Sequence, residues 1–123
     1  MATHNEFGKA GEQHAVEYLI TKGYIIRDTN WRYGKMEIDI VAEKGDRIVI
    51  VEVKTRSSGI LMPYEAVDNK KIRNLVRAAN AYINYFNLPH EVQFDIISIT
   101  GVPGNFTIEH IPDAFLPPLN IYR

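Results

Sequence analysis

The segment Ile48-Val49-Ile50-Val51 constrains the fold of this chain most strongly, because it is apolar on both of the faces that a strand presents. A half-exposed strand alternates apolar and polar residues, whereas a strand that is apolar on both faces lies in the middle of a covered sheet. Helices must then cover the two faces of that sheet. The chain has 123 residues, enough for one hydrophobic core. We therefore expect residues 1–123 to form a single α/β domain.

Two helices are predicted to supply the covers. The first spans residues 3–22, and Gly23 follows it as a stop signal. The second spans residues 63–86, with Pro63 well placed in its first turn. Residues at helical spacing form one stripe on each helix: Gly8, Glu12, Ala15, Val16 and Leu19 on the first, and Val67, Lys71, Leu75, Ala78, Tyr82 and Phe86 on the second. Each stripe is apolar or small except for one charged residue, Glu12 or Lys71.

Runs rich in Ile and Val predict the strands, and Asn30, Gly34 and Gly45 separate the first three. The chain order is α-β-β-β-α-β, which gives a mixed central sheet flanked by helices. Residues 101–104 read as a turn, after which a further short strand is expected. The predicted strands cover residues 24–26, 36–42, 47–54, 92–100 and 106–111.

Composition excludes several classes of protein. Without cysteine there are no disulfides, zinc fingers or thiol nucleophiles. Fourteen basic against fifteen acidic residues argue against a protein that coats nucleic acid through bulk charge. No segment approaches the roughly 20 apolar residues of a membrane span, and residues 1–7 are polar where a signal peptide would be apolar. We expect a cytoplasmic protein that does not enter a membrane.

Polar residues at the ends of the second and third strands form the candidate site. Gly-Asp at residues 45–46 is typical of a two-residue hairpin turn. Such a turn would place Asp39 directly opposite Glu52 and Glu37 opposite Lys54. Because side chains alternate between the faces of a strand, all four would lie on one face of the sheet.

Two ionised carboxylates at directly opposed positions repel each other unless a positive charge lies between them. Oxygen ligands suit Mg²⁺, or Mn²⁺ as its substitute, and substrate phosphate commonly completes their coordination. Lys54 beside Asp39 and Glu52 would then position a water and stabilise developing charge, which predicts metal-assisted phosphodiester hydrolysis. The alternative interpretation of the same residues is a solvated ion-pair network on an exposed sheet face.

These residues resemble the D…(D/E)-x-K signature of the restriction-endonuclease-like nuclease superfamily. Over nearly the whole chain, the sequence is similar to the YraN-like bacterial proteins. That resemblance implies a core similar to archaeal Holliday junction resolvases, and hydrolysis of branched or structured DNA in repair or recombination. The motifs that carry it are Gly11-Glu12, Asn30 with Arg32, Glu37-Ile38-Asp39-Ile40-Val41-Ala42, Val51-Glu52-Val53-Lys54-Thr55-Arg56 and residues 110–115.

The resemblance also implies roles for individual residues. Asp39 and Glu52 would be the metal carboxylates, the main-chain carbonyl of Val53 a further ligand, and Lys54 the catalytic lysine. Glu12 resembles the first-helix glutamate that resolvase-like proteins add to the site. The alternative for Glu12 is a carboxylate that the positive end of the helix dipole favours.

Basic side chains near the predicted site are candidates for DNA contact. Lys71 interrupts an apolar stripe, and Arg56 continues the strand that carries the catalytic lysine, so both are expected to touch phosphates. Arg32 and Asn30 are further candidates. Glu37 is expected beside the metal ligands without binding the ion itself.

Other residues have plainer expected roles. Arg73 and Arg77, four residues apart, are expected on an ordinary solvated helix face. Trp31 is read as a half-buried strand residue, the alternative being that it borders the site beside Arg32. Four further aromatic residues are expected in the core rather than on a base-stacking surface: Tyr18, Tyr82, Tyr85 and Phe86.

Two other classes of function stay open at this stage. One is a DNA- or protein-binding module that keeps the nuclease fold without turnover, and the other is an interaction subunit that never meets nucleic acid. A homodimer is a separate expectation, because one small subunit offers one site and cutting two symmetric strands requires two. Residues 115–122 are its candidate contact.

Overall fold

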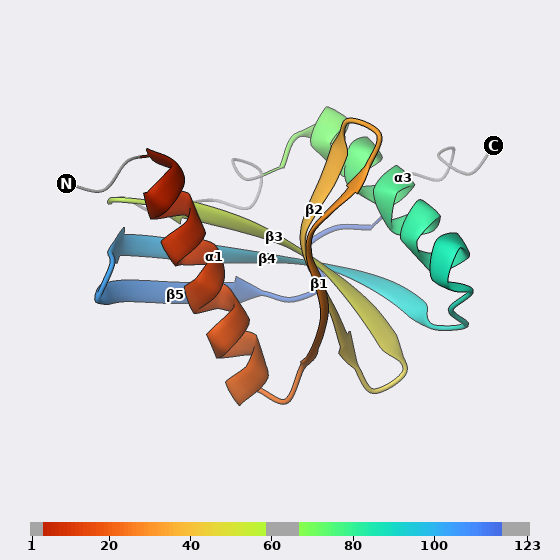
Figure 1. Ribbon diagram of the computed structural model, residues 1–123, viewed down its shortest axis with the longest axis horizontal. Coiled ribbons are helices and arrows are strands. Elements are labelled where there is room, and N and C mark those ends of the chain that lie inside the picture. The colour runs from red at the N-terminus through yellow and green to blue at the C-terminus, as the bar shows by residue number, and fades with distance from the viewer. Residues whose placement is uncertain (1–3, 59–66, 117–123) are drawn as a thin grey trace.

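The computed structural model describes residues 4–58 and 67–116 as an α/β fold (Figure 1). Within these residues, no helix is both long and apolar enough to span a bilayer. The predicted order of elements is confirmed, and the further short strand expected after it is present. The elements are α1 (His4–Thr21), β1 (Ile25–Tyr33), β2 (Met36–Lys44), β3 (Arg47–Arg56), α3 (Asn69–Phe86), β4 (Glu91–Val102) and β5 (Asn105–Ile111).

The five strands form one mixed sheet in the order β1-β2-β3-β4-β5. Only the β3–β4 pair is parallel, and the other neighbours are antiparallel. The central position of β3 confirms the interpretation of its apolar run. Ile48 and Ile50 pack into the core on the α3 side, whereas Val49 and Val51 pack into the core on the α1 side. Helices therefore cover both faces, as predicted (Figure 1).

Both helices end through backbone conformations that only some residues accept. Gly23, just after α1, has a φ of 90°, and the Tyr24 amide donates to the Leu19 carbonyl at 3.0 Å, which closes the helix. Asn87 ends α3 in the left-handed region. These observations confirm the predicted ends of both helices.

The start of α3 differs from the prediction. Pro63 lies outside the described residues, while Asp68 is extended and its carboxylate accepts the Lys71 amide at 2.8 Å. Asp68 is therefore the N-cap, and the helix begins at Asn69 rather than at residue 63.

The first strand is longer than predicted. Asn30 was expected to separate strands, but it lies inside β1 with a φ of 53°. Asparagine tolerates this left-handed conformation better than most residues, so the strand continues through it to Tyr33. A register shift between Ile26 and Asp28 adds a second irregularity. At the other edge, β4 and β5 join through a turn shorter than the predicted 101–104, because Val102 already pairs with Asn105.

The aromatic residues divide between the core and the surface. Tyr82 is fully buried, as predicted. Tyr18 is half-buried, with its hydroxyl bonded to His110. Tyr85 and Phe86 are 76% and 39% exposed, so the core prediction was wrong for them. The last turn of α3 lies beside the β1–β2 hairpin, which leaves part of each ring open.

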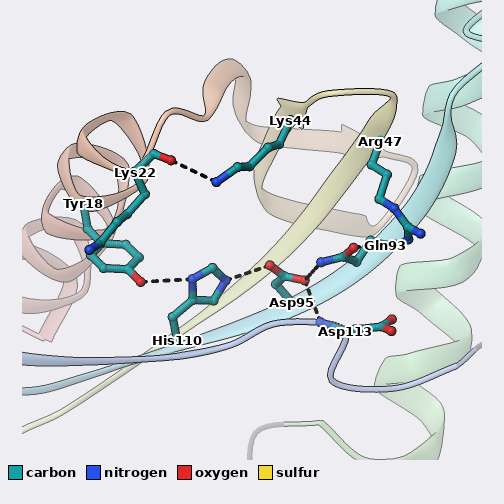
Figure 2. Close-up of polar contacts among 8 residues, drawn as sticks. All are labelled: Tyr18, Lys22, Lys44, Arg47, Gln93, Asp95, His110 and Asp113. Atoms are coloured by element: carbon teal, nitrogen blue, oxygen red, sulfur yellow. Dashed lines mark hydrogen bonds and ion pairs between the residues drawn. The ribbon is translucent and has the colours of Figure 1, made fainter.

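A buried polar network fastens α1 to the sheet (Figure 2). Asp95 on β4 is 1% exposed, and one of its carboxylate oxygens lies 2.7 Å from Nε2 of His110. The other oxygen accepts from the Gln93 side chain and the Asp113 amide, each at 2.9 Å. In the neutral imidazole, Nε2–H donates to Asp95, so Nδ1 accepts from the Tyr18 hydroxyl at 3.1 Å. The network links the C-terminal half of α1 to β4 and β5.

Removal of the Asp95 carboxylate tests this network. We expect Asp95→Ala to lower the free energy of unfolding in urea by roughly 2–4 kcal/mol, because the buried donors of His110 and Asp113 lose their acceptor. Glu109→Ala, an exposed site on β5, is the control and should change it by less than about 0.5 kcal/mol. Equal effects of the two substitutions would contradict the assignment.

Candidate active site

The candidate site lies where β2 and β3 separate. Their antiparallel ladder runs from Lys44 with Arg47 to Ile40 with Val51, which confirms the predicted turn and register. The ladder then stops, and Figure 1 shows β1 and β2 turning away from the other strands. Beyond this point, Asp39 Oδ2 accepts a hydrogen bond from the Val53 amide at 2.9 Å.

This side-chain bond corrects one detail of the prediction. Asp39 was expected to pair directly with Glu52, and Glu37 with Lys54, but the ladder ends before both pairs. The Asp39 carboxylate takes a backbone donor of β3 and holds the two strands at their point of separation. Glu37 instead pairs across β1–β2 with Arg32, at 2.9 Å between the carboxylate and the guanidinium.

An open cavity of about 580 Å³ occupies the gap between the diverging strands. Its walls come from α1, β1, β2 and β3, so segments far apart in the sequence meet there. Lys9 and Thr55 add to the walls, together with Phe7 and Gly8. The predicted site residues that line the cavity are Glu12, Asn30, Arg32, Glu37, Asp39, Glu52, Val53 and Lys54.

Glu52 is the most unusual group in the cavity. Its residue is 7% exposed, and Oε1 lies 3.3 Å from Nζ of Lys71. Among the residues that the structure describes, Oε2 is buried with no hydrogen-bond partner. Burial, followed by the charge of Asp39, raises the pKa of Glu52 to about 7. One oxygen of this carboxylate is therefore buried without a donor from the described residues to stabilise its charge.

Asp39 meets a similar conflict. Burial raises its pKa, while the hydrogen bond from the Val53 amide and the charge of Lys71 act in the opposite direction. Asp39 and Glu52 are close enough for the charge of Asp39 to disfavour that of Glu52, and burial disfavours both. Binding of a cation between them would therefore be favourable. Such a cation would stabilise both charged forms at once.

Glu12 reaches the same cavity from α1. The helix approaches β3 so closely that a Cβ atom at Gly11 would overlap the Thr55 side chain. This contact brings the neighbouring Glu12 to the cavity wall, where burial and the charge of Asp39 raise its pKa. The position at the cavity wall gives a reason for a carboxylate that interrupts the apolar stripe of α1.

The basic residues that were predicted for catalysis or DNA contact differ in whether they line the cavity. Lys54 is exposed and lines the cavity, and so does Arg32. Lys71 was expected to touch phosphate, but it forms an ion pair with Glu52. Arg56, at the end of β3, is not part of the cavity wall. Lys9 was missed, because a lysine in the first turns of a helix carries no distinctive sequence signal.

The carboxylate oxygens of the cavity can be compared with the ligands that a divalent metal ion requires. Among residues 4–58 and 67–116, no group of three or more histidine and acidic side chains is arranged to hold an ion. Mg²⁺ does not need one, because it commonly binds one or two protein carboxylates and keeps water or phosphate oxygens as its other ligands. Asp39 and the unpartnered Oε2 of Glu52 provide hard oxygen donors of this kind. The residues present therefore fit Mg²⁺ or Mn²⁺.

Comparison with other proteins establishes the family. The five-stranded mixed sheet with its two helices places the protein in the α/β class. Residues 11–99 match the family described as "Uncharacterised protein family UPF0102". The chain belongs to this family, which is the YraN-like family that the motifs indicated. It is 57% identical to a UPF0102 protein of Bacteroides thetaiotaomicron over 97% of this chain and 99% of the relative. A UPF0102 protein of Flavobacterium psychrophilum is 49% identical, over 94% and 98%.

The raised pKa of Glu52 predicts that its charge opposes folding. The folded protein holds the proton up to about pH 7, whereas the unfolded chain releases it near the ordinary value of 4.5. The penalty is therefore absent below about pH 4.5, grows as the pH rises, and is complete above about pH 7. In EDTA at pH 8, we expect Glu52→Gln to raise the free energy of unfolding by roughly 1–3 kcal/mol.

Urea unfolding of both proteins between pH 4.5 and pH 8 measures this difference, which should shrink as the pH falls. Glu109→Gln, at an exposed position of β5, serves as the charge-matched control and should show little change. A Glu52→Gln protein that is less stable than wild type at pH 8, or a difference independent of pH, would contradict the prediction.

Proposed function

We propose that this protein is a metal-dependent endonuclease that hydrolyses phosphodiester bonds in DNA. The observation that carries the proposal is the buried, unpartnered Oε2 of Glu52 beside Asp39, in a cavity that also contains Lys54. A purely structural ion pair would satisfy both oxygens of a carboxylate at this depth. A buried oxygen without a donor calls for an explanation, and a bound cation beside Asp39 supplies one.

Each part of the cavity has a role in this proposal. Asp39, Glu52 and the main-chain carbonyl of Val53 would hold Mg²⁺ or Mn²⁺, which supplies Lewis-acid chemistry and an activated water. The Lys54 ammonium lies on the exposed side of the cavity, where it can orient a water and stabilise charge on a phosphate. Arg32 and Lys9 contribute further positive charge to the walls.

Glu12 and Glu37 line the same cavity but are not the main proposed metal ligands. Glu12 adds a third carboxylate that reaches the cavity from α1 and feels the charge of Asp39. Glu37 is paired with Arg32, so it sets the position of that guanidinium rather than binding the metal. Of the two residues, Glu12 is the better candidate to contact the ion or its water.

DNA is the proposed substrate class, and branched or structured DNA in repair or recombination is the form that the family resemblance suggests. A cytoplasmic location agrees with the absence of cysteine from the sequence. Arg56 and Asn30 remain candidates for contact with the strand, Asn30 from the cavity wall and Arg56 from the end of β3. Lys71 is better explained as the partner of Glu52.

One observation favours a second candidate, a DNA- or protein-binding module without turnover. The Lys71 ammonium lies 3.3 Å from Glu52 and supplies positive charge to the acids without a metal. In that case the protein would retain DNA with no metal requirement and release no products. An interaction subunit that never meets DNA would bind none even at low salt, where electrostatic attachment is strongest.

Cleavage of labelled linear, flapped and four-way DNA in Mg²⁺ or Mn²⁺ tests the proposal. We expect wild-type protein to release products, and Asp39→Asn and Lys54→Met each to slow cleavage by at least about 100-fold, because each removes a group that stabilises the transition state. Glu109→Gln is the control and should cleave as wild type does. Absence of cleavage on every substrate, or cleavage unaffected by Asp39→Asn, would remove the enzyme proposal.

A two-fold dimer would let two such sites act on symmetric strands. The suggested contact spans residues 115–122, of which 117–122 lie outside the described residues. Phe115 stacks on Phe94 of its own sheet, with ring centroids 5.0 Å apart. Light scattering at micromolar concentration should return twice the monomer mass of 14.1 kDa, and a monomer would remove the dimer proposal.

A further inference from the structure

A second cavity, of about 450 Å³, lies between the β1–β2 hairpin and the last turns of α3. Aromatic side chains from both elements form most of its walls: Trp31 and Tyr33 from β1, and Tyr85 and Phe86 from α3. We call this cavity the aromatic groove. Its volume falls within the range of roughly 300–1,000 Å³ that is typical of small-ligand sites.

The rings of the aromatic groove are unusually accessible. Tyr85 is 76% exposed, Tyr33 51% and Phe86 39%. Contacts nevertheless hold the walls in place, since the Tyr85 and Phe86 rings meet edge to face at 4.8 Å and Trp31 meets the buried Tyr82 ring at 5.0 Å. Several accessible rings on a fixed base form a surface for a flat, apolar partner.

Basic residues lie beside the aromatic groove and along the helix that leads to it, although Arg27 also pairs with Glu43 at 3.5 Å. The Arg27 guanidinium lies 5.7 Å from the centre of the Phe86 ring. On α3, Lys70, Arg73 and Arg77 are exposed along the turns that precede the groove. Cations next to accessible rings match a single nucleic-acid strand, which has flat bases and a negatively charged backbone. An apolar peptide or a second copy of this near-neutral chain would not need such a rim.

Arg32 connects the aromatic groove to the candidate active site. The residue lines both cavities, and its side chain is 70% exposed while paired with Glu37. A DNA strand with one phosphate in the candidate active site can therefore continue past Arg32, so that its next bases reach the rings of the aromatic groove. In a duplex those bases are stacked and paired, so only an unpaired base offers its faces to the groove.

We propose that the aromatic groove stacks an unpaired base of a DNA strand that passes through the candidate active site. This inference rests on the proposed function and narrows its substrate class to DNA with a single-stranded segment beside the cleaved bond. It also gives Arg77 and Arg73 a role in strand contact beyond that of a solvated helix face.

Binding measured in EDTA tests the groove separately from catalysis. Trp31 is the only tryptophan of the chain, so its fluorescence reports directly on the groove. At low salt, we expect oligo(dT) to change that fluorescence, whereas a blunt duplex changes it little. Because one stacked base contributes roughly 1–3 kcal/mol, Tyr85→Leu should weaken oligo(dT) binding by roughly 5- to 140-fold, and Tyr85→Phe, which keeps the ring, should not.

Val102→Ala removes an exposed apolar side chain on the distant β4–β5 hairpin and should bind as wild type does. Thermal unfolding confirms that each variant is folded. Oligo(dT) affinity of Tyr85→Leu within two-fold of wild type, or an equal loss for the blunt duplex, would overturn the inference.

The same variants separate this inference from the proposed function. If wild type cleaves DNA and Tyr85→Leu binds oligo(dT) as tightly as wild type, the base-stacking proposal is wrong and the nuclease proposal stands. If oligo(dT) binding depends on Tyr85 but wild type cleaves no DNA in Mn²⁺, the base-stacking proposal stands and the nuclease proposal is wrong.

Discussion

The hydrogen bond from the Val53 amide to the Asp39 carboxylate marks the point on which the geometry of the site depends. It replaces the next step of the β2–β3 ladder, so the strands separate while remaining attached at one position. The separation opens the cavity and lets residues from both strands and from α1 face one space. The close packing of Gly11 against Thr55 then places Glu12 in the same space. A buried network around Asp95 fixes α1 at its other end (Figure 2).

Charge in the cavity is only partly compensated by the protein itself. Lys71 neutralises one side of Glu52, but the remaining oxygen and the nearby Asp39 stay in a poorly solvated space. Functional sites commonly retain such unfavourable arrangements, because the cost in stability is offset when a ligand binds. The proposed metal site therefore predicts a protein that is more stable with a cation than without one. The same reasoning explains why the acids line an open cavity and not the closed apolar core.

Much of the fold and the main pair of acids were predictable from local patterns. Strand periodicity and the two-residue turn set the register that brings Asp39 near Glu52, and the apolar run identified β3 as central. Features that arise from contacts between distant segments were not predictable. The pairing of Lys71 with Glu52 depends on how α3 packs on the sheet, and the exposure of Tyr85 depends on where that helix ends. A sequence pattern shows which residues are unusual, but not which distant residue each will meet.

The central claim is that Asp39 and Glu52 together bind a hard divalent cation. Diffraction from a crystal soaked in Mn²⁺, recorded where manganese scatters anomalously, tests it most directly. The account predicts a single strong anomalous peak between the Asp39 and Glu52 carboxylates, which disappears in a crystal of the Asp39→Asn protein. A map with no peak at these carboxylates, from a crystal soaked at millimolar Mn²⁺, would contradict the account.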